Sequence, residues 1–251
     1  MSTQIDPGTR VLRYVDAIRE ALEQEMDVDP SVFVFGLDVD DHKGIQGSTM
    51  GLVDKFGAER VFTTPLSEDA MTGVAIGAAM TGMRPVHVHI RMDFMMLAMN
   101  QLVNMAAKTH YMYGGAYKVP IVVRSMIGKS WGQGAQHSQA LHAWFSHVPG
   151  LRVVMPSSVS DARDLLIASV LCPDPVVYID DRWLYEETDD IAGVNLLDLK
   201  NEGPKVVLEG TDITIIGVGF GTLLGKQAAS KLEATGVSAE IIDVRVLNPL
   251  N

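Results

Sequence analysis

The sequence of 251 residues contains a single cysteine, and its 20 lysines and arginines are outnumbered by 31 acidic residues. With Cys172 alone, no disulfide can form within the chain, which fits a reducing, cytoplasmic setting. The net charge of −11 disfavours sequence-independent nucleic-acid binding, which depends on neutralising phosphates. No apolar run reaches the roughly 20 residues of a membrane span, and MSTQIDPGTR lacks the basic-then-apolar layout of a signal peptide. We therefore expect a cytoplasmic protein that binds neither nucleic acid nor membrane.

Common nucleotide and metal motifs are also missing, since the chain has no G-x-x-x-x-G-K-[ST], no H-E-x-x-H and no C-x-x-C. The run GVGFGT at 217–222 does not have the G-x-G-x-x-G spacing, so we interpret its glycines as positions where a helix and a strand pack closely. His87 and His89 share one face of an expected strand, but no nearby Cys or Glu completes a metal set. We interpret them as hydrogen-bonded or partly exposed histidines rather than ligands.

Apolar runs typical of buried strands alternate with helical patterns along the chain. These runs lie at 32–36, 85–90, 119–124, 151–155 and 175–180. The segment from Met92 to Tyr111 is apolar, rich in methionine and long enough for one helix. Such alternation predicts an α/β fold with a parallel sheet and helices on both faces.

A polar stretch with the acidic run EETDD separates this region from the rest of the chain. We expect a first domain at 1–185, a linker at 186–205 and a second domain at 206–251. The second region holds one strand–helix–strand unit, which cannot cover both faces of a sheet. We therefore expect the second domain to be partial, with the chain stopping early at Asn251.

Two polar residues stand where parallel α/β proteins bind ligands. Glu68 lies at a strand-to-helix junction, in TTPLSEDAM, where strand ends face a crevice. Locally, a functional carboxylate and one that only stabilises the helix N-terminus are equally supported. His137 lies in the polar, glycine-flanked loop WGQGAQHSQ, a setting that favours a functional histidine.

Four longer runs carry a resemblance to a known family: TTPLSEDAMTGVAIGAAMTGMRPV, NQLVNMAAKTHYMYGGAYKVPIVVR, GAQHSQALHAWFSHVPGLRVVMPSSVSDARDLL and PDPVVYID. In this order and spacing the chain resembles the β subunit of the pyruvate dehydrogenase E1 family, which includes the branched-chain 2-oxo acid and acetoin dehydrogenases. The resemblance extends from about residue 10 to the end. It implies a thiamine-diphosphate pyrimidine-binding domain, followed by the start of a transketolase-type C-terminal domain.

The resemblance implies roles for four residues. Glu68 matches the glutamate that hydrogen-bonds the aminopyrimidine ring of thiamine diphosphate and so promotes loss of the C2 proton of the thiazolium ring. Phe94 matches an aromatic residue that stacks on the pyrimidine, and Ile90 an apolar residue of the same pocket. His137 matches a loop histidine that stabilises the substrate carboxylate or the intermediate and assists acyl transfer.

The resemblance also implies a structural potassium ion held by backbone oxygens, those of Ile121, Ser169, Val170, Cys172 and Asp174. Four positions depart from the family pattern. Leu37 replaces a glutamate expected in a proton relay between active sites, Val88 replaces a second glutamate, and Arg91 and Met92 are atypical. These departures affect the expected substrate and any communication between sites.

The chain has no G-D-G followed by asparagine, the motif that grips magnesium and the diphosphate. The resemblance therefore implies an α-type E1 partner that holds the magnesium, in an α2β2 heterotetramer. It implies decarboxylation of pyruvate or a related 2-oxo acid and acyl transfer to a lipoyl-bearing E2 acyltransferase. Two alternatives are the C-terminal half of a split transketolase acting on sugar phosphates, and a truncated, non-catalytic β-like partner chain.

Overall fold

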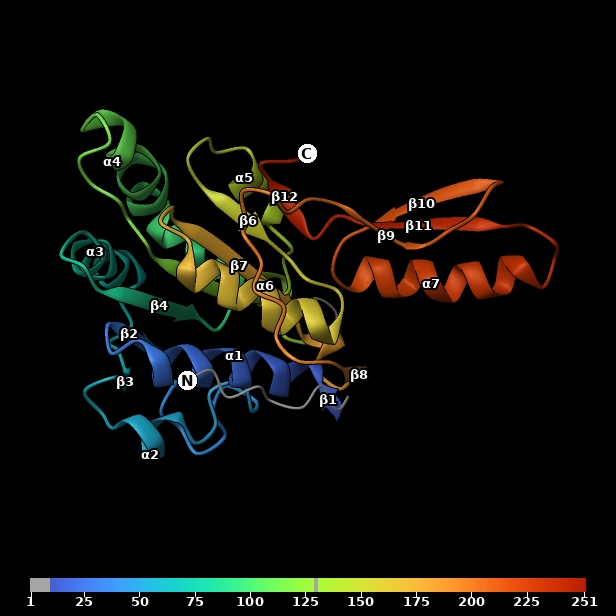
Figure 1. Ribbon diagram of the computed structural model, residues 1–251. Coiled ribbons are helices and arrows are strands. Elements are labelled where there is room, and N and C mark those ends of the chain that lie inside the picture. The colour runs from blue at the N-terminus through green and yellow to red at the C-terminus, as the bar shows by residue number, and fades with distance from the viewer. Residues whose placement is uncertain (1–9, 129–130) are drawn as a thin grey trace, which may run out of the picture.

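The computed structural model describes residues 10–128 and 131–251, and its centre is a seven-stranded sheet (Figure 1). The strand order is β12-β6-β7-β5-β4-β2-β3, and all neighbouring pairs from β6 to β3 are parallel. β12 pairs with β6 in the antiparallel sense. The strands of this sheet are β2 (Val32–Gly36), β3 (Val61–Thr63), β4 (Arg84–His89), β5 (Val122–Ile127), β6 (Arg152–Val154), β7 (Val176–Asp181) and β12 (Val246–Asn248).

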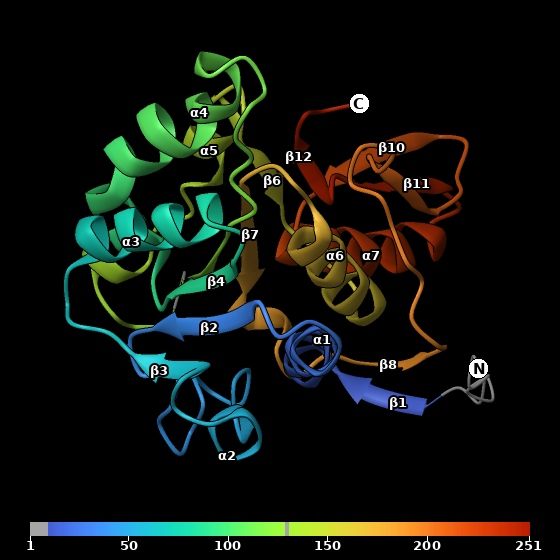
Figure 2. The same ribbon diagram turned by 60° about the vertical axis from the view of Figure 1, so that its left-hand side comes forward.

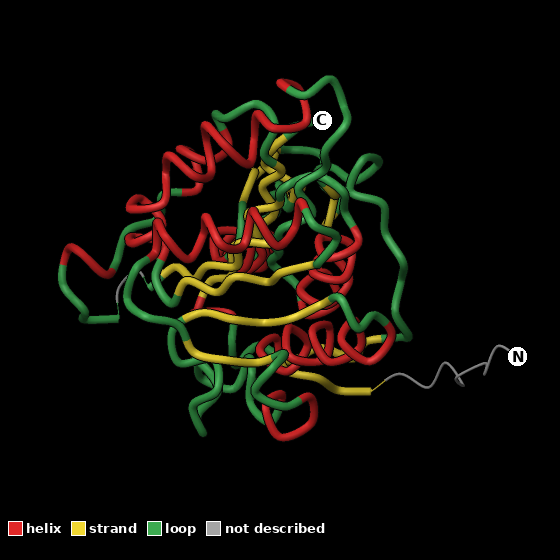
Figure 3. The backbone as a smooth tube through the Cα atoms, turned by 90° about the vertical axis from the view of Figure 1, so that its left-hand side faces the viewer, coloured by secondary structure: helices red, strands yellow, loops and turns green. Residues whose placement is uncertain are grey.

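Helices cover both faces of this sheet, because its strands are apolar on both sides. One face packs against α1 (Tyr14–Val28) and α6 (Val159–Leu171), which also contact each other. The other face packs against α3 (Glu68–Met80) and the helical segment that follows β4. The strands lie as one layer between the helices in Figures 2 and 3. This arrangement confirms the predicted α/β fold class.

The segment predicted as one long helix is helical throughout but changes pitch along its length. It begins as the 3₁₀ helix η1 (Met92–Ala98), widens to the π-helical η2 (Gln101–Ala106) and ends as α4 (Ala107–Met112). Departures from α-helical pitch are frequent at functional sites. Here the tight first part changes which side chains share a face, which matters for the cleft described below.

A smaller unit stands beside the main sheet, on the right of Figure 1. It consists of β9 (Lys205–Leu208), β10 (Ile213–Gly217), α7 (Phe220–Glu233) and β11 (Ala239–Asp243). The strand order is β10-β11-β9, with β10 and β11 parallel. One face of this sheet packs on α7, and Ile241 and Ala229 are buried between them.

Two pairings connect segments that the sequence analysis assigned to different parts. β8 (Thr188–Ile191) lies inside the expected linker and pairs with β1 (Arg10–Arg13). β12, at the end of the expected second domain, joins the main sheet through β6. The domain boundaries themselves stay a prediction.

The remaining helical elements are short. They are α2 (Leu52–Phe56), η3 (Ala135–His137), α5 (His142–Ser146) and η4 (Arg182–Leu184). Within the described part of the chain, no helix combines the length and apolar character needed to cross a membrane.

Candidate functional site

A cleft of about 530 Å³ lies at the carboxyl ends of β2, β4 and the loop after β3, the edge where parallel sheets bind ligands. Its walls are largely apolar, and a few polar groups converge on it. The lining residues are Leu37, Thr64, Pro65, Leu66, Ser67, Glu68, Met71, His87, Val88, His89, Ile90, Arg91, Phe94, Leu97 and His137. All four residues implied to act on the cofactor or substrate, at positions 68, 90, 94 and 137, are among them.

Glu68 is the first residue of α3 and lies half-buried on the wall of the cleft. The approach to the helix is fixed by backbone hydrogen bonds, from Thr64 N to Gly36 O at 3.1 Å and from Ser67 N to Pro65 O at 2.9 Å. Ser67 occupies the N-cap position of α3, but its side chain makes no capping hydrogen bond. The carboxylate thus lies at the positive end of a helix and also faces the cleft.

Gly36 allows the strands behind this wall to approach closely. A Cβ atom there would lie 2.2 Å from the carbonyl oxygen of Val88, and the φ of Gly36 is +153°. Any larger residue would separate β2 from β4 at the point where both reach the cleft.

The 3₁₀ pitch of η1 explains how its N-cap residue and two residues within it reach the same cleft. With about three residues per turn, side chains three positions apart share a face. Arg91, Phe94 and Leu97 are spaced in this way, and all three line the cleft. An α-helix would turn these positions progressively away from one another.

The loop that carries His137 is held by the residues around the start of η1. Gln139 donates from its backbone N and its Nε2 to Asp93 Oδ1, at 3.1 and 2.8 Å. Arg91 Nε donates to Gln133 Oε1 at 2.9 Å. A Cβ on Gly128 would lie 2.8 Å from the carbonyl oxygen of His137. The loop that carries His137 is therefore held in place by the side chains of Arg91 and Asp93, at the start of η1.

The two histidines of β4 line the deep part of the cleft, and each is only 3% exposed. Thr72 Oγ1 lies 3.3 Å from His87 Nδ1 and 3.4 Å from His89 Nε2, and the two rings are 4.4 Å apart between centroids. Burial lowers the pKa of His89 to about 4, and it lowers that of His87 well below the ordinary value. Both imidazoles are therefore neutral near pH 7. The alternation in PVHVHI placed them on one face, but it gave no signal for their position at the cleft.

The cleft suits an aromatic heterocycle. Leu37, Ile90 and Phe94 offer apolar surface, and Glu68 offers one carboxylate that can bond a ring nitrogen. Leu37, Val88 and Arg91, which the sequence analysis marked as departures, also line the cleft. These residues that depart from the family pattern therefore line the same cleft as the four residues implied to act on the cofactor or substrate.

The backbone carbonyls implied to bind potassium already accept hydrogen bonds at several positions. Among residues 10–128 and 131–251, no group of three His, Cys, Asp or Glu side chains is arranged to hold a metal ion. Of the carbonyls implied for potassium, that of Val170 accepts a hydrogen bond from Arg84 Nη1 at 2.7 Å. The carbonyl of Ser169 accepts one from Cys172 N at 3.3 Å, and that of Ile121 accepts one from Val176 N at 2.9 Å. A guanidinium at this place disfavours a further cation, and the potassium assignment, including Asp174, stays a prediction.

Comparison with known families identifies both parts of the chain. Residues 10–187 match the transketolase pyrimidine-binding domain, and residues 204–251 match the transketolase C-terminal domain. A solved structure titled as a split-gene transketolase in an inactive β4 tetramer has a TM-score of 0.72 and covers 93% of this chain and 71% of its own. At 20% identity, this likeness concerns the fold alone.

Three curated relatives are similar over nearly the whole chain. The pyruvate dehydrogenase E1 component subunit beta-2 of Oryza sativa, named as mitochondrial, is 43% identical over 94% of this chain and 64% of its own length. The corresponding subunit beta of Rhizobium meliloti is 40% identical over 94% of this chain and 51% of its own. The 2-oxoisovalerate dehydrogenase subunit beta of Bacillus subtilis is 40% identical over 96% and 74%. The chain thus spans between half and three quarters of the length of these relatives.

Proposed function

Because the chain belongs to the pyruvate dehydrogenase E1 β-subunit family, we propose that it is the β-type half of a thiamine-diphosphate-dependent enzyme that decarboxylates a 2-oxo acid. The observation that carries this proposal is the cleft, in which Glu68, Phe94, Ile90 and His137 converge from separate elements. The relatives are named as 2-oxo acid dehydrogenase subunits, which favours this activity over the sugar-phosphate chemistry of a split transketolase.

When bound, thiamine diphosphate supplies the electron sink that decarboxylation requires. Glu68 would hydrogen-bond the pyrimidine ring nitrogen and hold the shared proton there, because its carboxylate faces the cleft from the first residue of α3. Phe94 and Ile90 orient the ring by apolar contact and keep water from its face. The protein thereby sets the position and the protonation of the cofactor.

His137 acts on the substrate side of the cleft. Its ring meets the ring of Phe94, and its loop is held by Asp93 through Gln139. An imidazole positioned in this way can donate a hydrogen bond to the substrate carboxylate and later assist transfer of the acyl group to a lipoyl-bearing E2 partner.

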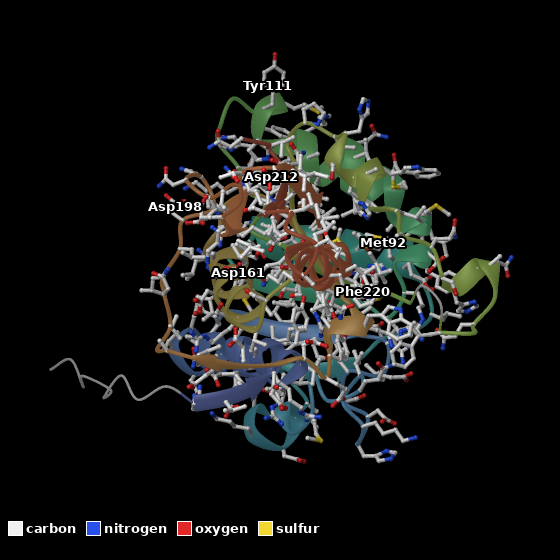
Figure 4. The ribbon with its side chains drawn as sticks, turned by 90° about the vertical axis from the view of Figure 1, so that its right-hand side faces the viewer. Met92, Tyr111, Asp161, Asp198, Asp212 and Phe220 are labelled. Carbon is white, nitrogen blue, oxygen red and sulfur yellow. The ribbon has the colours of Figure 1, made fainter. Side chains whose placement is uncertain are left out.

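We assign magnesium and the diphosphate to an α-type E1 partner, in an α2β2 assembly. The helical segment after β4 offers a surface for such a partner, since Leu97, Met105, Tyr111, Met112 and Tyr113 are all exposed. Tyr111 projects outward from α4 in Figure 4 and is 88% exposed. Large apolar side chains gathered on one exposed element are typical of interaction sites. We also propose a cytoplasmic location, because the only cysteine is free and buried.

The test is calorimetric titration of thiamine diphosphate, with magnesium present, into this chain, into the α-type chain and into their mixture. Tight binding in the mixture alone, followed by release of CO₂ from a 2-oxo acid, is the expected result. Tight binding by this chain alone would contradict a shared site. Binding in the mixture without turnover of any 2-oxo acid would identify a non-catalytic β-like partner and contradict the proposed activity.

A further inference from the structure

Two arginines lie at the carboxyl ends of β4 and β7, the two strands on either side of β5. Arg91 follows β4 and lines the cleft, and Arg182 follows β7 as the first residue of η4. β5 pairs with both strands, so the two ends meet at the same edge of the sheet. Arg91 is 8% exposed and Arg182 is 9% exposed, which is rare for unpaired arginines.

Within the described part of the chain, neither of these two guanidinium groups donates a hydrogen bond to a carboxylate. Arg91 donates to Gln133 Oε1 at 2.9 Å and to the carbonyl of Ile90 at 2.8 Å, both neutral acceptors. Arg182 stacks over the ring of Trp131, with Cζ 4.0 Å from the ring centroid. Its Nε and Nη1 are buried and have no hydrogen-bond partner within the described part of the chain. Neither arginine forms an ion pair with a carboxylate of the described residues.

The charges also oppose each other. Burial lowers the pKa of Arg182, and the nearby charge of Arg91 lowers it further, while Tyr185 acts in the opposite direction. Burial likewise lowers the pKa of Arg91, against the influence of Tyr185 and Asp93. Two buried, mutually repelling guanidinium groups are unfavourable by themselves, and an anion between them relieves both costs.

Aromatic rings pack around Arg182. Trp183 lies 5.5 Å from Trp131 and 5.5 Å from Phe220, between ring centroids. Phe220 begins α7, so the smaller unit contributes one of these rings; its position is labelled in Figure 4. A guanidinium that already stacks on an aromatic ring loses less conformational entropy when it binds a ligand.

The chemistry of decarboxylation indicates which anion suits this pair. When the C1–C2 bond of a 2-oxo acid breaks, the carboxylate leaves as CO₂ and its charge is lost. Two fixed cations at that carboxylate would stabilise the ground state more than the transition state. An anionic group at the far end of the substrate keeps its charge throughout, so binding it does not oppose the reaction.

We infer that Arg91 and Arg182 form an anion subsite beside the cleft, and that the substrate is a 2-oxo acid with a second, distal carboxylate. The inference rests on the proposed function, whose reaction takes place at the other end of the same substrate. Gln133 and Trp131 are positioning residues in this account, because they hold the guanidinium groups.

The first experiment compares kcat/KM for 2-oxoglutarate and for 2-oxopentanoate, which has the same carbon chain without the distal carboxylate, in the complex with the α-type partner. The wild type is expected to prefer 2-oxoglutarate by at least about tenfold. In Arg182→Gln that preference falls roughly ten- to hundred-fold, mainly through KM, because a charge-assisted hydrogen bond is lost. Arg182→Lys is expected to lie between. Arg19→Gln, which removes a partly exposed charge on α1, leaves the preference unchanged.

The second experiment measures binding without turnover. Glutarate is titrated into the complex while the fluorescence of Trp131 and Trp183 is followed, with pentanoate at equal ionic strength as the control. Saturation by glutarate that Arg182→Gln abolishes supports the subsite, even if no 2-oxo acid is turned over; in that case the proposed function falls and the subsite stands. Equal turnover of both 2-oxo acids, together with a glutarate response that Arg182→Gln does not change, overturns the subsite and leaves the proposed function intact.

Discussion

The rings of Phe94 and His137 meet edge to face, with centroids 5.1 Å apart and planes inclined by 74°. Phe94 belongs to η1 and His137 to the loop after β5, so this contact joins the two elements that reach the cleft from adjacent strands. An edge-to-face aromatic contact contributes about 0.5–1.5 kcal/mol beyond its buried area. The pair therefore fixes how η1 and the loop that carries His137 lie relative to each other at the cleft.

The first prediction concerns Phe94→Leu, which keeps apolar volume but removes the aromatic ring. Thiamine diphosphate should bind the assembled complex about three- to tenfold more weakly, because ring stacking is lost. Calorimetry on the complex measures this directly. Phe56→Leu on α2, away from the cleft lining, is the matched control and should bind as the wild type does. Unchanged affinity in Phe94→Leu would contradict its assignment as a cofactor contact.

The second prediction concerns stability against pH. His89 is neutral in the folded protein, with a pKa of about 4, whereas in the unfolded chain it titrates near 6.5. Between these values only the unfolded chain takes up the proton, so stability is present above about pH 6.5 and is lost as the pH falls towards 4. In His89→Leu, the loss of unfolding free energy between pH 7 and 5 should be smaller by about 2 kcal/mol.

Urea denaturation at a series of pH values tests this expectation. His42→Gln is the control, because the His42 side chain is 80% exposed, and its pH dependence should follow that of the wild type. An identical pH dependence in His89→Leu and the wild type would show that His89 does not titrate as described.

The third prediction concerns a buried ion pair between β5 and β7 of the main sheet. Arg124 Nη2 and Asp180 Oδ2 are 2.9 Å apart, and both side chains are fully buried. Arg124 also donates to Ser48 Oγ at 2.8 Å, which fastens the loop between β2 and α2 to the sheet. Arg124→Met should lower the free energy of unfolding by about 3–5 kcal/mol, because it leaves Asp180 buried and unpaired.

Adding Asp180→Asn to that variant should restore part of the loss, since the uncompensated charge is then removed. Denaturant unfolding of both single variants and the double variant gives the coupling free energy. Strictly additive effects would contradict a direct interaction between the two side chains.

The fourth prediction concerns the partner surface on α4. Tyr111→Asp combined with Met112→Asp should weaken association with the α-type chain at least about tenfold, because two large apolar contacts are replaced by charges. Sedimentation velocity of the mixture measures the association. Val28→Asp, at another exposed apolar position, is the control and should associate normally. Undiminished association of the double variant would place the interface elsewhere.

The fold was largely predictable from the sequence, because alternation of apolar runs and helical patterns is a local property. The parallel direction of the strands from β2 to β7 follows from this alternation. The pairing of β12 with β6 and of β8 with β1 was not predictable, since strands of three or four residues carry too little pattern to set their partners. The change of pitch after β4 was also missed, because 3₁₀ and α-helical segments have similar composition.

The candidate site was predictable only in part. The local sequence supported two interpretations of Glu68 equally, a functional carboxylate and one that only stabilises the helix. The family resemblance favoured the functional interpretation. The structure brings Glu68, Ile90, Phe94 and His137 to one cleft, while their individual roles stay predictions. The sequence around Arg182 gave no indication of a functional role. That role depends on Arg91, which is distant in the sequence and near only in the folded chain.

The central claim is that Glu68 controls the protonation of the bound cofactor. The most direct measurement is the rate at which the thiazolium C2 proton of thiamine diphosphate exchanges with deuterium in the assembled complex, followed by NMR after acid quench. Glu68→Gln, whose amide has nearly the same shape but cannot share the proton, should slow this exchange by roughly a hundredfold or more while the fold stays intact. Exchange at the wild-type rate in Glu68→Gln, with cofactor bound, would contradict the account.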